Sequence, residues 1–180
     1  MHYLFIHGAW HAAWCWQKIA RALTQRGHTV LTPDLPGHGH NWRPSHAVTL
    51  DDYVQHVVAL VKAQSLPVTL IGHSMAGFII TAVAAQIPHL IRELIFVAAF
   101  IPKENDSLSS LAKTLTYHSL DPYLVFDETN KEVSFTSSSA LTSIFFNRCS
   151  ALDARQASAQ LQTQPLMPWQ QEVQMNAAWH

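Results

Sequence analysis

The chain has 180 residues, of which 48% are hydrophobic and 13% are charged, and its formal net charge is −1. That length can bury one substantial core, and the scattered charges exclude a basic nucleic-acid stripe or a polybasic membrane patch. Cys15 and Cys149 lack a CxxC spacing, so we expect reduced thiols in a cytoplasmic protein rather than a disulfide framework or a thiolate zinc site. The first ten residues show no secretory signal pattern.

Residues 3–8, YLFIHG, form a short apolar run ending at glycine, which is typical of a buried strand. Residues 13–27 then place apolar side chains at helical spacing and finish at Gly27, a common helix stop. Residues 28–40, HTVLTPDLPGHGH, predict a second strand that runs into a Pro- and Gly-rich loop, where we expect Asp34 to fix the turn.

This alternation continues to residue 100. Residues 49–64 predict a helix, with Thr49 as N-cap and acidic residues in its first turn. A strand over 68–72, a helix over 74–86 and a strand over 92–100 follow. Strands alternating with helices indicate parallel βαβ units, so the predicted fold class is α/β.

Residues 68–87 form an uncharged run of twenty residues, which is long enough to span a bilayer. However, Pro67 and Pro88 bracket the run, and His73 and Ser74 lie inside it. We therefore predict a buried strand joined to a buried helix, and no membrane span.

Residues 103–180 are rich in Ser, Thr and Gln and show helical patches at 107–115 and 152–162. Residues 132–135, EVSF, indicate at most an edge strand. We predict a core over 1–102 and a helical lid over 103–180, with a mobile polar tail as the alternative.

The segment Gly72-His73-Ser74-Met75-Ala76 joins the predicted strand to the predicted helix. Gly-x-Ser-x-Gly at such a junction is the nucleophile elbow of serine hydrolases, in which small residues let the strand and helix approach. Here the fifth position is Ala, and Gly77 follows it. A buried strand-turn-helix with a structural serine would give the same pattern.

Four segments occur in the order FIHGAWHAAWCW, TPDLPGHG, TLDDYV and LIGHSMAGFII, and NRCSALDARQASAQLQTQPLMPW follows them. Together they resemble the α/β hydrolases of plants and bacteria that include methylesterases and hydroxynitrile lyases. The resemblance covers nearly the whole chain. It implies an α/β-hydrolase fold, with a parallel sheet, flanking helices and a helical lid.

The resemblance assigns Ser74 as nucleophile and the backbone N–H groups of Ala9 and Met75 as the oxyanion hole. Two donors must face the oxygen that becomes anionic when a carbonyl is attacked. Esterases of this group carry His before the serine, whereas the hydroxynitrile lyases carry an acidic residue, so His73 favours ester hydrolysis.

Trp10, His73 and Phe100 are candidates for the substrate pocket, although an aromatic core explains Trp10 and Phe100 equally well. A metal pair at His7 and His11 is conceivable, but no third ligand is suggested. His38 and His40 lie in a segment that resembles the family's structural loop. We expect local packing and hydrogen bonding for these histidines, no metal and no cofactor.

In this fold the triad follows the order Ser, Asp or Glu, then His. The family places the acid and the His after the lid, and we find neither segment before the chain ends at QMNAAWH. The final strands of the family's sheet are therefore expected to be absent, which leaves an open, apolar sheet edge. His118 and His180 are the substitute bases within the chain, and the acids available to them are Asp106, Asp121, Asp127 and Asp153.

The sequence thus leaves three interpretations. The first is a serine esterase acting on a small-molecule ester, in which this 180-residue form is incomplete and almost inactive without a complementing C-terminal fragment. The second is a hydrolase-like protein that binds a small apolar ligand without turnover, and the third is a decayed gene product. An exposed sheet edge would also favour a homo-oligomer, and we predict neither a nucleic-acid nor a membrane partner.

Overall fold

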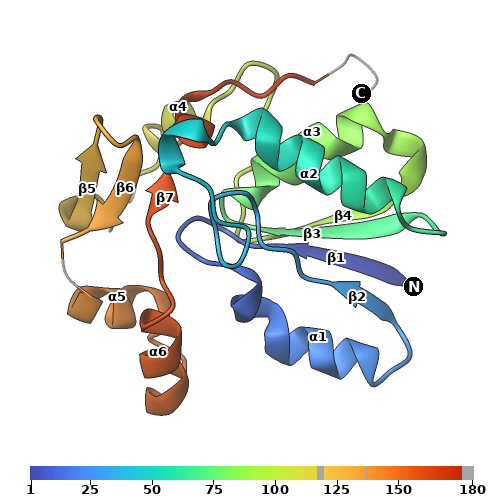
Figure 1. The fold of residues 1–180 in the computed structure, drawn as a ribbon, viewed down its shortest axis with the longest axis horizontal. Helices are drawn as coiled ribbons and strands as arrows, with labels where there is room; N and C mark the ends of the chain where they lie inside the picture. Colours follow the sequence, from blue (N-terminus) through green and yellow to red (C-terminus); the bar gives the residue numbers. More distant parts are fainter. Residues whose placement is uncertain (117–119, 137, 176–180) are drawn as a thin grey trace.

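The computed structural model describes residues 1–116, 120–136 and 138–175 of the chain. Its main sheet has four parallel strands in the order β2-β1-β3-β4. These strands are β1 (His2–Ile6), β2 (Thr29–Leu31), β3 (Val68–His73) and β4 (Ile91–Val97). Helices α2 (Leu50–Lys62) and α3 (Ala76–Gln86) cover one face of the sheet, and α1 (Gln17–Thr24) covers the other, as Figure 1 shows. The α/β class and the parallel sheet are therefore confirmed.

Local sequence explains these helices well. Thr49 caps α2 through a capping box, because its side chain accepts the Asp52 N–H while the Asp52 carboxylate accepts the Thr49 N–H. Helix α3 is buried along most of its length and follows β3 directly, so the apolar run 68–87 is a strand and a helix, as predicted. Among the described residues, no helix is long and apolar enough to cross a membrane.

Residues 103–175 contain both helices and a second, three-stranded antiparallel sheet in the order β5-β6-β7. The strands are β5 (Leu124–Asp127), β6 (Glu132–Phe135) and β7 (Gln164–Pro165), and the helices are α4 (Leu108–Ala112), α5 (Ser138–Phe145), α6 (Ala151–Ser158) and α7 (Met167–Gln170). Short 3₁₀ turns lie at Ala13–Trp16, Ser45–Ala47, Pro88–Leu90 and Asp121–Tyr123.

The prediction that residues 132–135 form at most an edge strand, in an otherwise helical segment, is wrong. Strand β6 is the central strand of the second sheet, and Val133 is fully buried in it. The strand is only four residues long, so its hydrophobic alternation is too short to distinguish a central from an edge position. It is central because β5 pairs with one side of it and the more distant β7 with the other.

An aromatic cluster joins the second sheet to the loop after β1. The Trp10 ring centroid lies 4.6 Å from that of Phe135 and 5.1 Å from that of Trp169. The Trp10 indole N–H also donates a hydrogen bond of 3.0 Å to the Val133 carbonyl oxygen. The loop after β1 is therefore held by residues more than 120 positions later in the sequence.

Strand β4 lies at the edge of the main sheet. The predicted strand over 92–100 ends earlier, at Val97, because Ala98 has a φ of 43° that extended backbone does not allow. Ile95 and Val97 are each 39% exposed, so this edge presents apolar side chains.

Candidate active site

Ser74 lies in the turn between β3 and α3 with a φ of 55°. A non-glycine residue in this left-handed region is uncommon and persists only when the surroundings hold it. Here the Ser74 N–H donates to the Val97 carbonyl at 3.3 Å, and the Ser74 carbonyl accepts the N–H of Phe100 at 3.1 Å. The strain and its support are those expected of a nucleophile elbow.

Small residues on both sides of Ser74 are required by backbone contacts. A Cβ placed on Gly72 would lie 3.0 Å from the Ala76 carbonyl oxygen. A Cβ on Gly77 would collide with the Phe100 carbonyl oxygen. The alanine at the fifth motif position is itself fully buried without conflict, because the closest backbone approach falls one residue later, at Gly77.

The loop after β1 packs directly against this elbow. A Cβ on Gly8 would lie 3.0 Å from the Ser74 Cβ and 2.8 Å from the His73 Nδ1. Ala9 and Met75 are 4% and 2% exposed, and within the described part of the chain neither backbone N–H has a protein acceptor. Because buried N–H groups are nearly always paired, two unpaired donors beside a serine are suited to bind an anionic oxygen.

Two histidines fix the carbonyl groups of this loop. His7 accepts the Leu35 N–H at Nε2, so its Nδ1 carries the proton and donates to the Gly8 oxygen at 2.9 Å. The His11 Nδ1 lies 2.8 Å from the Ala9 oxygen and donates to it. The expected local hydrogen bonding of both residues is confirmed.

The imidazoles near the elbow are neutral at pH 7. Burial, with a smaller contribution from the nearby His11, lowers the pKa of His73 to about 4. Burial also lowers the pKa of His7 to about 4, that of His38 well below 6.5, and that of His11 below its ordinary value. The groups that favour negative charge at this site are therefore the backbone N–H groups and the N-terminus of α3.

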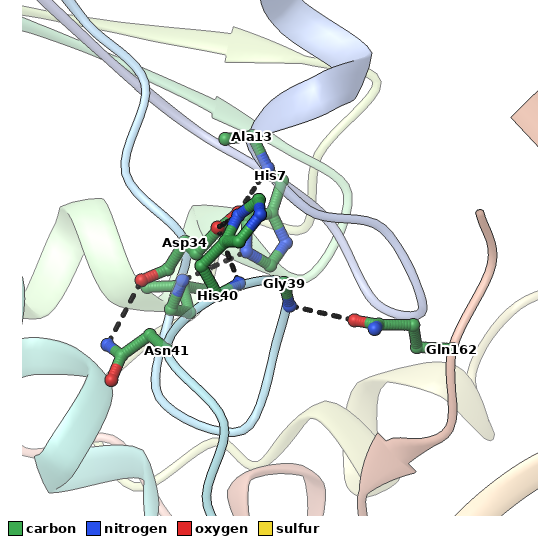
Figure 2. A network of polar contacts seen from close by, with 8 residues as sticks. His7, Ala13, Asp34, Gly39, His40, Asn41 and Gln162 are labelled. Atoms are coloured by element: carbon green, nitrogen blue, oxygen red, sulfur yellow. Dashed lines mark hydrogen bonds and ion pairs between the residues drawn. The ribbon is translucent and has the colours of Figure 1, made fainter.

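Asp34 organises the Pro- and Gly-rich loop, as predicted. Its carboxylate accepts the Ala13 N–H at 2.7 Å and the His40 N–H at 2.9 Å, and Figure 2 shows these contacts. Partial burial raises the pKa of Asp34, but the hydrogen bonds from His40 and Ala13 outweigh it and hold the pKa below its usual value. Among the described residues, no three His, Cys, Asp or Glu side chains are grouped as a metal site.

A cleft of about 410 Å³ opens beside the elbow. His73, Trp16 and Val97 line it from the main sheet and the loop after β1, and Phe146 lines it from residues 103–175. Its wall therefore includes the residue before Ser74 and the residue that binds the Ser74 N–H. Aromatic side chains line part of this cleft, and polar or charged ones line the rest, namely Gln17, Lys18, Asp153, Gln156 and Gln160. The cleft is therefore suited to a small ligand with both apolar and polar parts.

The other two pocket candidates lie in different surroundings. Trp10 is 5% exposed and belongs to the aromatic cluster described above. The Phe100 ring lies 6.4 Å from that of Phe78, and its backbone holds the Ser74 turn. Neither residue is among those that line the cleft, so contact of Trp10 or Phe100 with a substrate stays a prediction.

The structure brings no general base to Ser74 within the described residues, where no side chain hydrogen-bonds its hydroxyl group. His118 and His180, the two substitute bases, lie outside the described residues. All four candidate acids have other interactions. Asp106 accepts the Lys103 N–H, Asp127 binds the β5–β6 turn, Asp153 pairs with Lys18, and Asp121 also has a contact of its own. A complete triad is therefore not formed by the residues that the structure describes.

Two glutamines that sequence reasoning did not single out contact the loop after β1. The Gln162 N–H donates to the Trp10 oxygen at 3.0 Å, and the Gln164 Oε1 accepts the Trp10 N–H at 3.4 Å. These partners are 152 and 154 residues apart in sequence. No local pattern indicates such a pair.

Comparisons with known proteins agree with this geometry. A model of the alpha/beta hydrolase family matches residues 3–179. A carbendazim hydrolyzing esterase from Nocardioides sp. (strain SG-4G) is 41% identical over 112 residues, which are 61% of this chain and 46% of that protein. Methylesterase 18 from Arabidopsis thaliana is 33% identical over 140 residues, 75% of this chain and 52% of that protein.

Among solved structures, an extracellular alpha/beta-hydrolase from a Paenibacillus species superposes with a TM-score of 0.81 at 27% identity. The alignment covers 98% of this chain and 72% of that structure. The chain thus spans about half the length of the two curated relatives. Since the family model matches nearly every residue, the chain belongs to the alpha/beta hydrolase family.

Proposed function

We propose that the protein hydrolyses a small carboxylic ester through an acyl-enzyme on Ser74. The observation that carries this proposal is the left-handed Ser74 beside the unpaired N–H groups of Ala9 and Met75. The Ser74 oxygen attacks the ester carbonyl carbon, and the carbonyl oxygen, now anionic, accepts both N–H groups. Collapse expels the alcohol, which takes up a proton, and water then releases the acid and restores the serine.

The proposal needs a general base that accepts the Ser74 proton. Within the chain the candidates are His118 and His180. Otherwise the base comes from a second copy or a complementing segment that pairs with the exposed edge of β4, where Ile95 and Val97 face outward. Without a base, the oxyanion hole and binding alone supply about 10³-fold over water, far below an intact triad.

The substrate that fits the site is small. The cleft beside the elbow has aromatic residues in its wall together with the charged pair Lys18 and Asp153, and His73 is neutral at pH 7 because burial lowers its pKa to about 4. His73 stands where hydroxynitrile lyases of this group carry an acidic residue, which favours ester hydrolysis over cyanohydrin cleavage. Two of the relatives compared above are named esterases.

Binding without turnover is the second candidate function. It is favoured by one observation, that no described side chain hydrogen-bonds the Ser74 hydroxyl. Under this alternative an apolar ligand occupies the cleft, and Ser74→Ala leaves its affinity unchanged. Turnover that depends on Ser74 contradicts the alternative directly.

A cytoplasmic location is also part of the proposal. Cys15 and Cys149 both have free thiols, which is the usual state in a reducing compartment. Burial raises the pKa of Cys15 to about 12, so this thiol is not ionised at neutral pH and is poorly reactive.

A burst and steady-state assay with p-nitrophenyl acetate and butyrate tests the proposal. The wild-type chain is compared with Ser74→Ala and with Ser65→Ala, a matched control at an exposed serine before β3. We expect a signal that Ser74→Ala abolishes and Ser65→Ala retains, with His118→Ala and His180→Ala then identifying the base. Equal rates for wild type and Ser74→Ala, in protein shown to be folded, contradict esterase activity of this chain.

A further inference from the structure

Trp10 follows Ala9, the proposed oxyanion-hole residue, in the loop after β1. Trp10 has a φ of 63°, although it is large and only 5% exposed. A bulky side chain in the left-handed region costs free energy, so other contacts must hold it there. Because Trp10 and Ala9 share a peptide bond, whatever fixes the backbone of Trp10 also fixes the direction of the loop that carries the Ala9 N–H.

The segment 162–164, which follows α6 and includes the first residue of β7, binds both the N–H and the carbonyl oxygen of Trp10. The Gln162 N–H donates to the Trp10 oxygen at 3.0 Å, and the Gln164 Oε1 accepts the Trp10 N–H at 3.4 Å. The Gln162 side chain also accepts the Gly39 N–H at 2.8 Å, which Figure 2 shows. The segment is thereby anchored to the loop of Asp34 as well.

The Gln164 side chain is fully buried, and each of its polar groups has a partner. Its Nε2 donates to the Pro165 oxygen at 2.8 Å and to the Tyr53 hydroxyl at 3.2 Å. The Tyr53 hydroxyl also lies within hydrogen-bond distance, 3.0 Å, of the His38 Nε2. These contacts fix the orientation of the amide, so that its oxygen, not its nitrogen, faces Trp10.

We propose that Gln164 is a positioning residue for the oxyanion hole: it holds Trp10 in its left-handed conformation and so aims the Ala9 N–H at the oxygen of a tetrahedral adduct on Ser74. This inference rests on the proposed function. It predicts that the loss of Gln164 weakens stabilisation of the adduct while leaving binding of the ground-state ester unchanged.

The test compares Gln164→Met with wild type and with Gln55→Met. Methionine keeps the length of the side chain and its packing but removes the amide, and Gln55 is an exposed control on α2 whose amide bonds only to surface partners. The first readout is the dissociation constant of phenylboronic acid, which forms a tetrahedral adduct with a serine oxygen. The second is amide hydrogen exchange at Trp10.

For Gln164→Met we expect boronate affinity to fall roughly tenfold to a hundredfold, less than the loss of a whole donor would cost. Exchange at the Trp10 amide accelerates at least tenfold, while amides of β3 keep their protection. With p-nitrophenyl acetate, kcat falls by a similar factor and KM changes less than twofold. Gln55→Met behaves like wild type throughout.

Several results overturn the inference. They are unchanged boronate affinity in Gln164→Met, unchanged Trp10 exchange, or a uniform loss of protection across the main sheet, which would indicate a purely structural role. Boronate binding to wild type that does not depend on Ser74 also overturns it. The proposed function fails separately: if wild type shows no Ser74-dependent turnover but Gln164→Met weakens boronate binding, the positioning role stands and esterase activity does not.

Discussion

Replacing His7 by Gln should remove a measurable part of the acid sensitivity of the folded chain. His7 is fully buried, and burial lowers its pKa from 6.5 to about 4. Between these two values the unfolded chain binds a proton that the folded chain does not. The contribution of His7 to stability is therefore complete above pH 6.5 and is lost as the pH falls toward 4.

The size of the effect follows from the shift. A change in pKa from 6.5 to about 4 corresponds to roughly 3 kcal/mol, of which about 2 kcal/mol is lost between pH 7.5 and pH 5. Glutamine keeps an acceptor for the Leu35 N–H and a donor for the Gly8 oxygen but does not titrate. His7→Gln should be less stable at pH 7.5, and its pH dependence should be smaller than that of wild type by about 2 kcal/mol.

Urea unfolding of wild type, His7→Gln and His89→Gln at pH 7.5 and pH 5 measures this difference. His89 is exposed in the 3₁₀ turn before β4, so its replacement controls for the loss of any histidine. The quantity compared is the loss of unfolding free energy between pH 7.5 and pH 5, in wild type and in each variant. This comparison is needed because His11, His38 and His73 also lie in buried surroundings and add their own acid sensitivity. If His7→Gln loses as much stability on acidification as wild type does, the reasoning is refuted.

Three further predictions concern stability and are measured by urea unfolding at pH 7.5. Gly77→Ala forces a methyl group against the Phe100 carbonyl oxygen, and we expect a loss of roughly 1–3 kcal/mol. Val133→Ala empties a fully buried position and should cost about 2 kcal/mol, whereas Val125→Ala, at a side chain 41% exposed, should cost less than half as much. Thr49→Ala removes the N-cap of α2 and should cost about 1 kcal/mol; a loss below 0.3 kcal/mol would contradict the capping role.

The parts of the fold that could be predicted from the sequence are those that depend on interactions between residues close together in the chain. The cap at Thr49, the buried run of β3 and the small residues around Ser74 each act within a few positions, so their pattern is readable. The second sheet was missed because β6 is four residues long and becomes central only through β5 and β7.

The parts of the candidate site also differ in whether they could be predicted from local sequence. The elbow and the loop after β1 follow from local motifs, whereas the support of Trp10 by Gln164 joins residues 154 positions apart. Hydrogen bonds between glutamines and backbone groups leave no periodicity in a sequence. The division of the chain into a core over 1–102 and a lid over 103–180 stays a prediction, as do the contacts of Phe100 with substrate.

The long-range support of Trp10 has a consequence for the order of folding. Val133, Gln162 and Gln164 leave the ribosome more than 120 residues after Trp10, and closing such loops costs entropy before any contact is made. The strands β1 and β3 can pair much earlier, since both lie within the first 73 residues. We therefore expect β1 and β3 to pair before the loop beside Ser74 has gained its long-range hydrogen bonds. The nascent chain should then become able to bind a ligand only after the sheet has formed.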